Sequence, residues 1–121
     1  MYRSMMQVYI KESDKALEFY KNAFDAEVKC DSRNIDGMVA HAELDVYGQI
    51  LAICETDEND VNNTMQFCLH FGAGEEAIVR KIYDVIKDGA KIVNYPLGPC
   101  EWSSLMVSLI DKYGINWCIF A

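Results

Sequence analysis

The chain has 121 residues, of which 51% are hydrophobic and 25% are charged, and its net charge is −8. This size and composition are typical of one globular domain with a small core, and the negative charge argues against nucleic acid as a partner because phosphate backbones are repelled. No stretch approaches the ~20 apolar residues that span a bilayer, and the N-terminus carries no signal-peptide pattern, so we expect a cytoplasmic protein without a membrane partner.

The first predicted elements are a strand at residues 5–10 and an amphipathic helix behind it. Ser13 or Asp14 can cap the helix, because their side-chain oxygens accept hydrogen bonds from the free amides of its first turn. The helix should end near Asp25. Its buried stripe consists of apolar residues that recur at spacings of three and four, namely Ala16, Leu17, Phe19, Tyr20, Ala23 and Phe24.

Three strands complete the first half of the chain. They are predicted at residues 26–31, 38–46 and 49–55. The middle strand alternates most cleanly, with His41 and Glu43 on its polar face and Tyr47-Gly48 forming a turn behind it. Its apolar face is predicted to hold Met38, Ala40, Ala42, Leu44 and Val46, and Val39 is expected on the polar side.

The second half repeats this order of elements. We expect a strand at 64–71, a helix between Gly72-Ala73-Gly74 and Gly89, and strands at 90–95, 105–110 and 115–120. The Pro-Leu-Gly-Pro segment at 96–99 is predicted as an irregular loop. Residues 111–114 are predicted as a type I turn, because Asp stands first and Gly last.

A short internal repeat supports the same division. Met6–Ile10 (MQVYI) returns as Met65–Leu69 (MQFCL), each time as the first strand of its half. We therefore predict an α+β fold, a single domain over 1–121, made of two βαβββ modules around a curved mixed-sheet cleft. Module one covers 1–55, the acidic linker 56–63, and module two 64–121. Gln7 and Gln66 would then face each other across a pseudo-twofold axis.

Two motifs carry a resemblance to a known family. Residues 16–24 (ALEFYKNAF) look like the helix "ALEFYKNVFG", and residues 111–117 (DKYGINW) look like the turn "DPFGNxW". With the order of elements, nearly the whole chain resembles the vicinal oxygen chelate superfamily, which includes glyoxalase I, bleomycin- and fosfomycin-resistance proteins and extradiol dioxygenases. The match is nearest to its PhnB-like, glyoxalase-like branch. The resemblance implies the glyoxalase/bleomycin-resistance/dioxygenase fold and a homodimer.

The resemblance also indicates where a metal would bind. Enzymes of this superfamily hold one divalent ion, mostly through His and Glu from the first and last strands of each half. In this chain those positions resemble Gln7, Gln66 and Cys118, and Glu55 is the acidic residue of the segment that holds the fourth. Neutral amides are weak ligands for Zn²⁺, Ni²⁺ or Fe²⁺. We therefore expect no metal and no cofactor; the alternative is a divalent metal on Gln7, Glu55 and Gln66.

Alternation along the strands identifies further cleft residues. Tyr9 shares the face of Gln7, where its hydroxyl either contacts a ligand or is satisfied within the core. His70 shares the face of Gln66 and is either a titratable base or a structural histidine. A Trp borders the pocket in PhnB-like proteins, so the resemblance implies that Trp102 either stacks on a ligand or covers the core. The predicted cleft for a small-molecule ligand consists of Gln7, Tyr9, Gln66, Cys68, His70, Trp102 and Cys118.

The remaining reactive side chains give weaker signals. The five cysteines are odd in number and include no C-x-x-C, as is usual for reduced thiols. Cys118 has no Lys or Arg close in sequence, so we expect an inert thiol. His41 is either a general base oriented by Glu43 or Glu55, or a surface or dimer-facing histidine.

These observations leave three functions open, and no catalytic residue is assigned. The first is a PhnB-like protein that binds a small organic molecule without a standard metal site. The second is a metal-dependent lyase, dioxygenase or transferase of the superfamily. The third is a drug-sequestering, resistance-type protein, for which the charge of −8 favours a cationic ligand. Whether the protein is an enzyme is not decided by the sequence.

Overall fold

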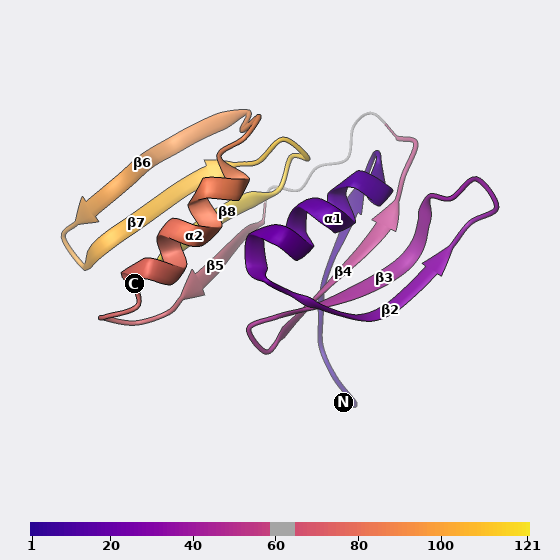
Figure 1. The fold of residues 1–121 in the computed structure, drawn as a ribbon, viewed down its shortest axis with the longest axis horizontal. Helices are drawn as coiled ribbons and strands as arrows, with labels where there is room; N and C mark the ends of the chain where they lie inside the picture. The colour runs from indigo at the N-terminus through magenta and orange to yellow at the C-terminus, as the bar shows by residue number, and fades with distance from the viewer. Residues whose placement is uncertain (59–64) are drawn as a thin grey trace. The chain divides into compact units, whose positions relative to one another are not determined.

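The computed structural model describes residues 1–58 and 65–121 (Figure 1). The chain forms two compact units, Met1–Val61 and Asn62–Ala121, and each is described by itself. Most of the predicted linker, from residue 59 onward, lies outside the described residues, as does Thr64 at the start of the next predicted strand. Within the described parts of the chain, no helix has the length and apolar character needed to cross a membrane.

The first unit is one mixed sheet with a helix on one face (Figure 1). Its elements are β1 (Met6–Ile10), α1 (Ser13–Phe24), β2 (Glu27–Arg33), β3 (Val39–Val46) and β4 (Gln49–Glu55). The strand order is β1-β4-β3-β2, in which β1 runs parallel to β4 and the other neighbours are antiparallel. The connection between the parallel strands β1 and β4 therefore consists of α1 together with β2 and β3.

The second unit repeats this topology. Its elements are β5 (Gln66–His70), α2 (Glu76–Ile86), β6 (Ile92–Cys100), β7 (Ser103–Ile110) and β8 (Asn116–Phe120). The strand order is β5-β8-β7-β6, again with one parallel pair, β5 and β8. The predicted α+β fold with two βαβββ modules is confirmed.

Each core lies between a helix and one face of its sheet. In the first unit the predicted stripe of α1 is buried, and Tyr20 stacks on Phe24 with ring centroids 6.2 Å apart. In the second unit Val79, Ile82 and Ile86 of α2 are fully buried. Burying one such aliphatic or aromatic side chain is worth about 1.5–3 kcal/mol, so both layers stabilise the fold.

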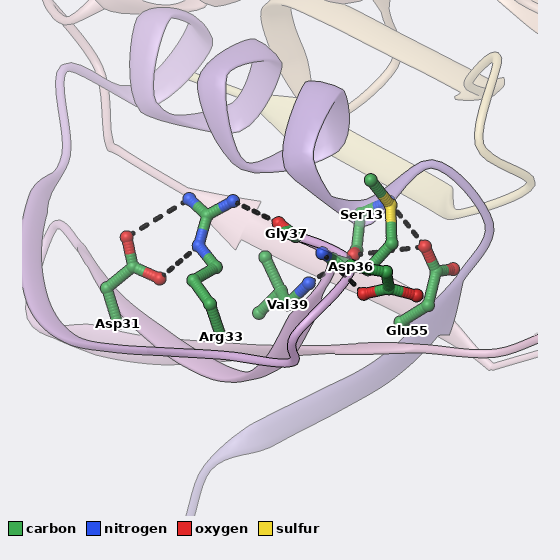
Figure 2. Close-up of polar contacts among 8 residues, drawn as sticks. Ser13, Asp31, Arg33, Asp36, Gly37, Val39 and Glu55 are labelled. Atoms are coloured by element: carbon green, nitrogen blue, oxygen red, sulfur yellow. Dashed lines mark hydrogen bonds and ion pairs between the residues drawn. The ribbon is translucent and has the colours of Figure 1, made fainter.

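The start of α1 corrects the predicted cap. Neither Ser13 nor Asp14 caps the helix; the N-cap is Glu12, in the left-handed conformation, and it makes no side-chain cap bond. Ser13 is buried instead: its Oγ accepts from the Val39 amide at 2.8 Å and donates to Glu55 Oε1 at 3.3 Å, and its own amide donates to the same Oε1 (Figure 2). The Glu55 carboxylate thus satisfies a free amide of the first turn, and joins β4 to α1.

Strand β3 departs from its predicted alternation at one end. Val39 is fully buried and Ala40 is exposed, which reverses their predicted faces. The cause is a register shift in the pairing with β2 between Ser32 and Arg33, because an extra residue in one strand exchanges the two faces. From Ala42 onward the alternation agrees with the prediction on the helix-covered side.

The β2–β3 hairpin is closed by its own side chains. Arg33 Nε donates to Asp31 Oδ1 at 2.6 Å and its Nη1 donates to the carbonyl of Gly37 at 3.0 Å (Figure 2). Asp36 Oδ1 accepts from the Met38 amide at 2.9 Å. Strand β2 extends to Arg33, beyond the end predicted at residue 31.

The segment 96–99 was predicted as a loop and is part of strand β6. This edge strand is irregular, with register shifts on both sides of Tyr95 and of Gly98. Proline lacks an amide hydrogen, so it is tolerated at the outer edge of a sheet and at bulges. The Tyr95 hydroxyl also donates to the carbonyl of Pro99 at 2.8 Å.

The predicted turn at 111–114 is organised by a buried carboxylate. Asp111 is fully buried; its Oδ1 accepts from the amides of Tyr113 (2.8 Å) and Ile115 (3.0 Å), and its Oδ2 accepts from Trp117 Nε1 (2.9 Å). Gly114 donates its amide to the Asp111 carbonyl and has φ 86°, which favours glycine. One side chain therefore fixes both the β7–β8 turn and the core tryptophan.

Replacing Asp111 by Ala should destabilise the protein strongly. Three N–H donors lose their acceptor, and each buried unsatisfied donor costs about 1–3 kcal/mol, so we expect a loss of at least ~3 kcal/mol in the free energy of unfolding. Urea denaturation measures it. Asp84→Ala on the exposed side of α2 is the control, with an expected change within about 0.5 kcal/mol. Equal unfolding midpoints for the two variants would contradict this role.

Candidate functional site

Each sheet leaves one face without a helix, and the polar side chains gather there. In β1, Val8 and Ile10 are buried while Gln7 and Tyr9 are exposed, as the period of two along a strand requires. The first-unit face is defined as Arg3, Gln7, Tyr9, His41, Glu43 and Cys54. The second-unit face is defined as Gln66, Cys68, His70, Trp102, Ser108, Asn116, Cys118 and Phe120.

On the second-unit face, Gln66 is held by two neighbours. Its Nε2 donates to Ser108 Oγ at 3.0 Å and to Asn116 Oδ1 at 3.1 Å. Within the described part of the chain, its carbonyl oxygen has no hydrogen-bond partner. Gln66 is thus a pre-oriented acceptor, and the residues that orient it, Ser108 and Asn116, were not identified from the sequence. Their positions opposite Gln66 follow from the β5–β8–β7 register, which the sequence does not give.

An aromatic row lies on the same face. The His70 ring stacks on Phe120, with centroids 4.4 Å apart and an interplanar angle of 18°. Trp102, from the β6–β7 turn, meets Phe120 edge-on at 4.7 Å and is 60% exposed. The structure thus brings two predicted site residues, His70 and Trp102, together through Phe120. Alternation in β8 was the available signal for Phe120, since it stands two residues after Cys118.

The two thiols of this face lie opposite each other. Cys118 of β8 is paired with Cys68 of β5. Burial, and secondarily the neighbouring Cys68, raises the pKa of Cys118 to about 11. Since the thiolate is the nucleophilic form, Cys118 is poorly reactive at neutral pH, in agreement with the expected inert thiol.

On the first-unit face, Gln7 is engaged with Tyr9. Its Nε2 donates to the Tyr9 hydroxyl oxygen at 2.9 Å. Glu55 lies on the other side of the same sheet, because it is paired with buried Ile10 and bonded to Ser13. Gln7 and Glu55, two residues of the alternative metal set, are therefore separated by the sheet.

Four further residues form a connected cluster on the first-unit face. Arg3 donates to Glu43 through both terminal nitrogens, at 2.5 Å to Oε1 and 3.0 Å to Oε2. His41 Nε2 lies 2.8 Å from Glu43 Oε2, and Cys54 Sγ lies 3.8 Å from His41 Nδ1. Of the two carboxylates predicted to orient His41, the structure places Glu43 beside it. Arg3 and Cys54 were missed, because neither has a recognisable motif around it.

The ion pairs set the charge state of this cluster. The Arg3 guanidinium, followed by His41, lowers the pKa of Glu43 from 4.5 to about 2 through hydrogen bonds, which outweigh the opposing effect of burial. The same carboxylate raises the pKa of Arg3. Glu43 is therefore a carboxylate throughout the physiological range, although its side chain is only 8% exposed. Burial raises the pKa of the Cys54 thiol.

The side chains that the resemblance assigns to a metal do not fit one. Gln7 and Gln66 offer only neutral amide oxygens, which are weak ligands for such metals. The Glu55 carboxylate already accepts from Ser13 and from the Thr56 amide. Among residues 1–58 and 65–121, no three His, Cys, Asp or Glu side chains are grouped so that they could hold a metal ion. Divalent transition metals prefer imidazole, thiolate and free carboxylate ligands.

Several solved structures share this fold. A PhnB protein from Bacillus cereus is 23% identical, with a TM-score of 0.80 and 98% coverage of both chains. Protein PA1353 from Pseudomonas aeruginosa is 14% identical, with a TM-score of 0.81 and coverage of 99% of this chain and 97% of that one. A mutant of the fosfomycin resistance protein FosX from Listeria monocytogenes, complexed with Mn(II) and a dihydroxypropylphosphonic acid, is 17% identical, with a TM-score of 0.68 and coverage of 98% and 88%.

These likenesses confirm the predicted fold. PhnB-like proteins and FosX are members of the vicinal oxygen chelate superfamily, and the glyoxalase/bleomycin-resistance fold expected from the sequence is the one observed. No protein-family model and no curated protein matches the sequence. At these identities the likeness establishes the fold, and the chemistry has to be argued from the side chains.

The ion pairs of Glu43 predict an acid-labile contribution to stability. Because its pKa is lowered on folding, the contribution is present above pH 4.5 and is lost as the pH falls towards about 2. Between these values the free energy of unfolding should fall more steeply for the wild type than for Glu43→Gln in urea denaturation. Glu18→Gln, an exposed carboxylate of α1, should keep the wild-type slope. Parallel curves for wild type and Glu43→Gln would show that the pairs contribute nothing.

The donor set predicts that divalent metals bind no dedicated site. A specific ligand at a hundredfold excess over its Kd would stabilise the fold by about 2.7 kcal/mol. We expect the melting temperature to be the same in chelator and in Zn²⁺, Ni²⁺, Mn²⁺ or Fe²⁺. A rise with one ion that disappears in Gln66→Ala would contradict this expectation, whereas a rise retained in that variant would indicate binding to surface thiols.

Proposed function

We propose that this chain, which has the fold shared by PhnB-like proteins and FosX, binds a small organic molecule on the second-unit face without a standard metal site. The observation that carries the proposal is the row formed by His70, Phe120 and Trp102 beside the oriented amide of Gln66. Binding sites for small molecules commonly combine apolar and aromatic surface with a few fixed polar groups.

The geometry of the row favours a planar ligand. His70 and Phe120 are nearly parallel, and Trp102 stands edge-on to Phe120 with most of its surface exposed. A flat molecule that stacks there buries the exposed indole and gains aromatic contacts worth about 0.5–1.5 kcal/mol each beyond area burial. Such a molecule would contact side chains from β5, β8 and the β6–β7 turn together.

Polar groups restrict the ligand further. Both N–H groups of the Gln66 amide are engaged, so the amide presents its carbonyl oxygen, which accepts a hydrogen bond from a ligand N–H or O–H. The net charge of −8 attracts cations over a distance of several ångströms. We therefore propose a planar, cationic molecule with an N–H donor, held reversibly.

Of the functions considered from the sequence, sequestration is the one that these features support. Stacking and one oriented acceptor are sufficient to hold a drug-like cation, as in the resistance-type hypothesis. The metal-dependent lyase, dioxygenase or transferase would need ligands that Gln7, Glu55 and Gln66 do not provide. The proposed homodimer and cytoplasmic location are independent of this choice.

Titration with proflavine, a planar aromatic cation with N–H donors, tests the proposal. We expect saturable binding by isothermal titration calorimetry, and a rise of about tenfold in Kd for Trp102→Ala, which corresponds to about 1.4 kcal/mol of lost stacking. Gln66→Leu, which removes the acceptor, should also weaken binding. The anionic analogue 9-anthracenecarboxylate should bind more weakly than proflavine.

The matched control is Tyr83→Ala, which removes an aromatic ring from α2, on the other side of the same unit. Its Kd should equal that of the wild type. If proflavine does not bind, or if Trp102→Ala and Tyr83→Ala change the Kd equally, the second-unit face is not the binding site.

A further inference from the structure

We propose that Cys54 on the first-unit face is a nucleophile that adds to α,β-unsaturated carbonyl compounds, with His41 as its general base. Glu43 and Arg3 act as positioning residues. This activity lies beyond the proposed binding function and uses none of the residues of the second-unit face. Either proposal can therefore fail without the other.

The proposal rests on a connected series of contacts between residues of β3, β4 and the N-terminal segment. Cys54 Sγ lies 3.8 Å from His41 Nδ1, His41 Nε2 lies 2.8 Å from Glu43 Oε2, and Arg3 clasps Glu43 through both nitrogens. Thiols and hydroxyls are activated as nucleophiles when a base lies within hydrogen-bond distance and a third group orients that base. The carboxylate fixes the tautomer of His41: the proton sits on Nε2, and Nδ1 presents its lone pair to the thiol.

Because Cys54 is protonated at neutral pH, its attack on a substrate requires a general base. Burial raises the pKa of this thiol, so few thiolates exist at neutral pH without assistance. Removal of the proton by His41 during attack avoids that requirement, and Glu43 stabilises the resulting imidazolium. The contact between Cys54 Sγ and His41 Nδ1 is the longest of the contacts that link Cys54, His41, Glu43 and Arg3. Catalytic hydrogen bonds are commonly long without substrate and shorten when it binds.

A small molecule has access to the cluster and finds a further polar group there. Cys54 is half-buried and the His41 side chain is 34% exposed. Tyr9, the direct partner of Cys54 in the β1–β4 pairing, is 48% exposed. Since its hydroxyl oxygen already accepts from Gln7, the phenolic hydrogen is available to a carbonyl oxygen of the substrate.

The proposed step balances without any co-reactant. Cys54 Sγ forms a bond to the β-carbon while its proton passes to His41 Nδ1, and the electrons of the carbon–carbon double bond shift to give an enolate. The Tyr9 hydroxyl donates to the enolate oxygen. The imidazolium then returns its proton to the α-carbon, so that S–H has added across the double bond. No oxidant, reductant or leaving group takes part.

Conjugate addition is favoured over acyl transfer by the position of the thiol. Acyl transfer needs several converging donors for a tetrahedral oxyanion, and backbone amides at a helix start commonly supply them. Helix α1 begins on the opposite side of β4, where the amide of Ser13 is bonded to Glu55. The face of Cys54 offers one hydroxyl donor, Tyr9, which suits an enolate.

Reaction with methyl vinyl ketone, followed cysteine by cysteine with peptide mass spectrometry, tests the proposal. Cys68 is the internal reference, because it is exposed. We expect Cys54 to react faster than Cys68 although it is less exposed, and His41→Gln to slow Cys54 by about a hundredfold, as general bases contribute 10²–10⁴-fold. The rate at Cys68 should not change. Tyr9→Phe should slow Cys54 by about tenfold, whereas Tyr83→Phe should not.

Positioning by Glu43 needs a separate readout. Glu43→Gln should slow Cys54 by about tenfold, and Glu43→Asp, which keeps the carboxylate, should restore part of the rate, whereas a purely structural role would make the shorter side chain no better. Circular dichroism checks that each variant is folded. If a variant unfolds, the reaction rate of Cys54 in Tyr9→Phe, a substitution at an exposed position, still tests the proposal. The proposal is overturned if Cys54 reacts no faster than Cys68, or if folded His41→Gln and Tyr9→Phe proteins react at wild-type rates.

Discussion

The two-residue period of the strands is the constraint on which both units depend. With a helix packed on one side of each sheet, every second side chain is committed to the core, and its neighbours are committed to the open face. Val8 and Ile10 belong to the first set, and Gln7 and Tyr9 to the second. Polar side chains of the strands are thereby placed on the two open faces. The buried side chains are mostly apolar, with Ser13, Ser103 and Asp111 among the exceptions.

The repeated topology carries two different sets of chemistry. On the first-unit face Glu43 joins a guanidinium and an imidazole, so the contacts are charged and respond to acid. On the second-unit face Gln66 is held by a hydroxyl and an amide, and the remaining surface is aromatic. The open faces of two units with the same topology therefore carry different side chains, in keeping with the general rule that a fold does not fix its chemistry.

The fold was largely predictable from sequence because periodicity and turn residues agree, as they do for α1 and for the turn at Asp111. The errors arose where a tertiary contact overrides a local preference. Ser13 has the right side chain for a cap, but it bonds to Glu55 instead, and a register shift reverses Val39. Within the candidate sites, the sequence could predict only which residues of one strand share a face. The contact between Cys54 and His41 depends on the register of β4 against β3, which alternation within one strand does not determine.

The bond between Glu55 and the start of α1 bears on how this chain could change in evolution. The resemblance places one metal-ligand position of the first half within residues 51–55, where Glu55 is the acidic side chain. Here the carboxylate faces the helix and accepts from the Ser13 amide and hydroxyl. Introducing a histidine at Gln7 would thus not be enough to create a metal centre with Glu55. The two side chains project from opposite faces of the sheet, and Glu55 is bonded to the start of α1.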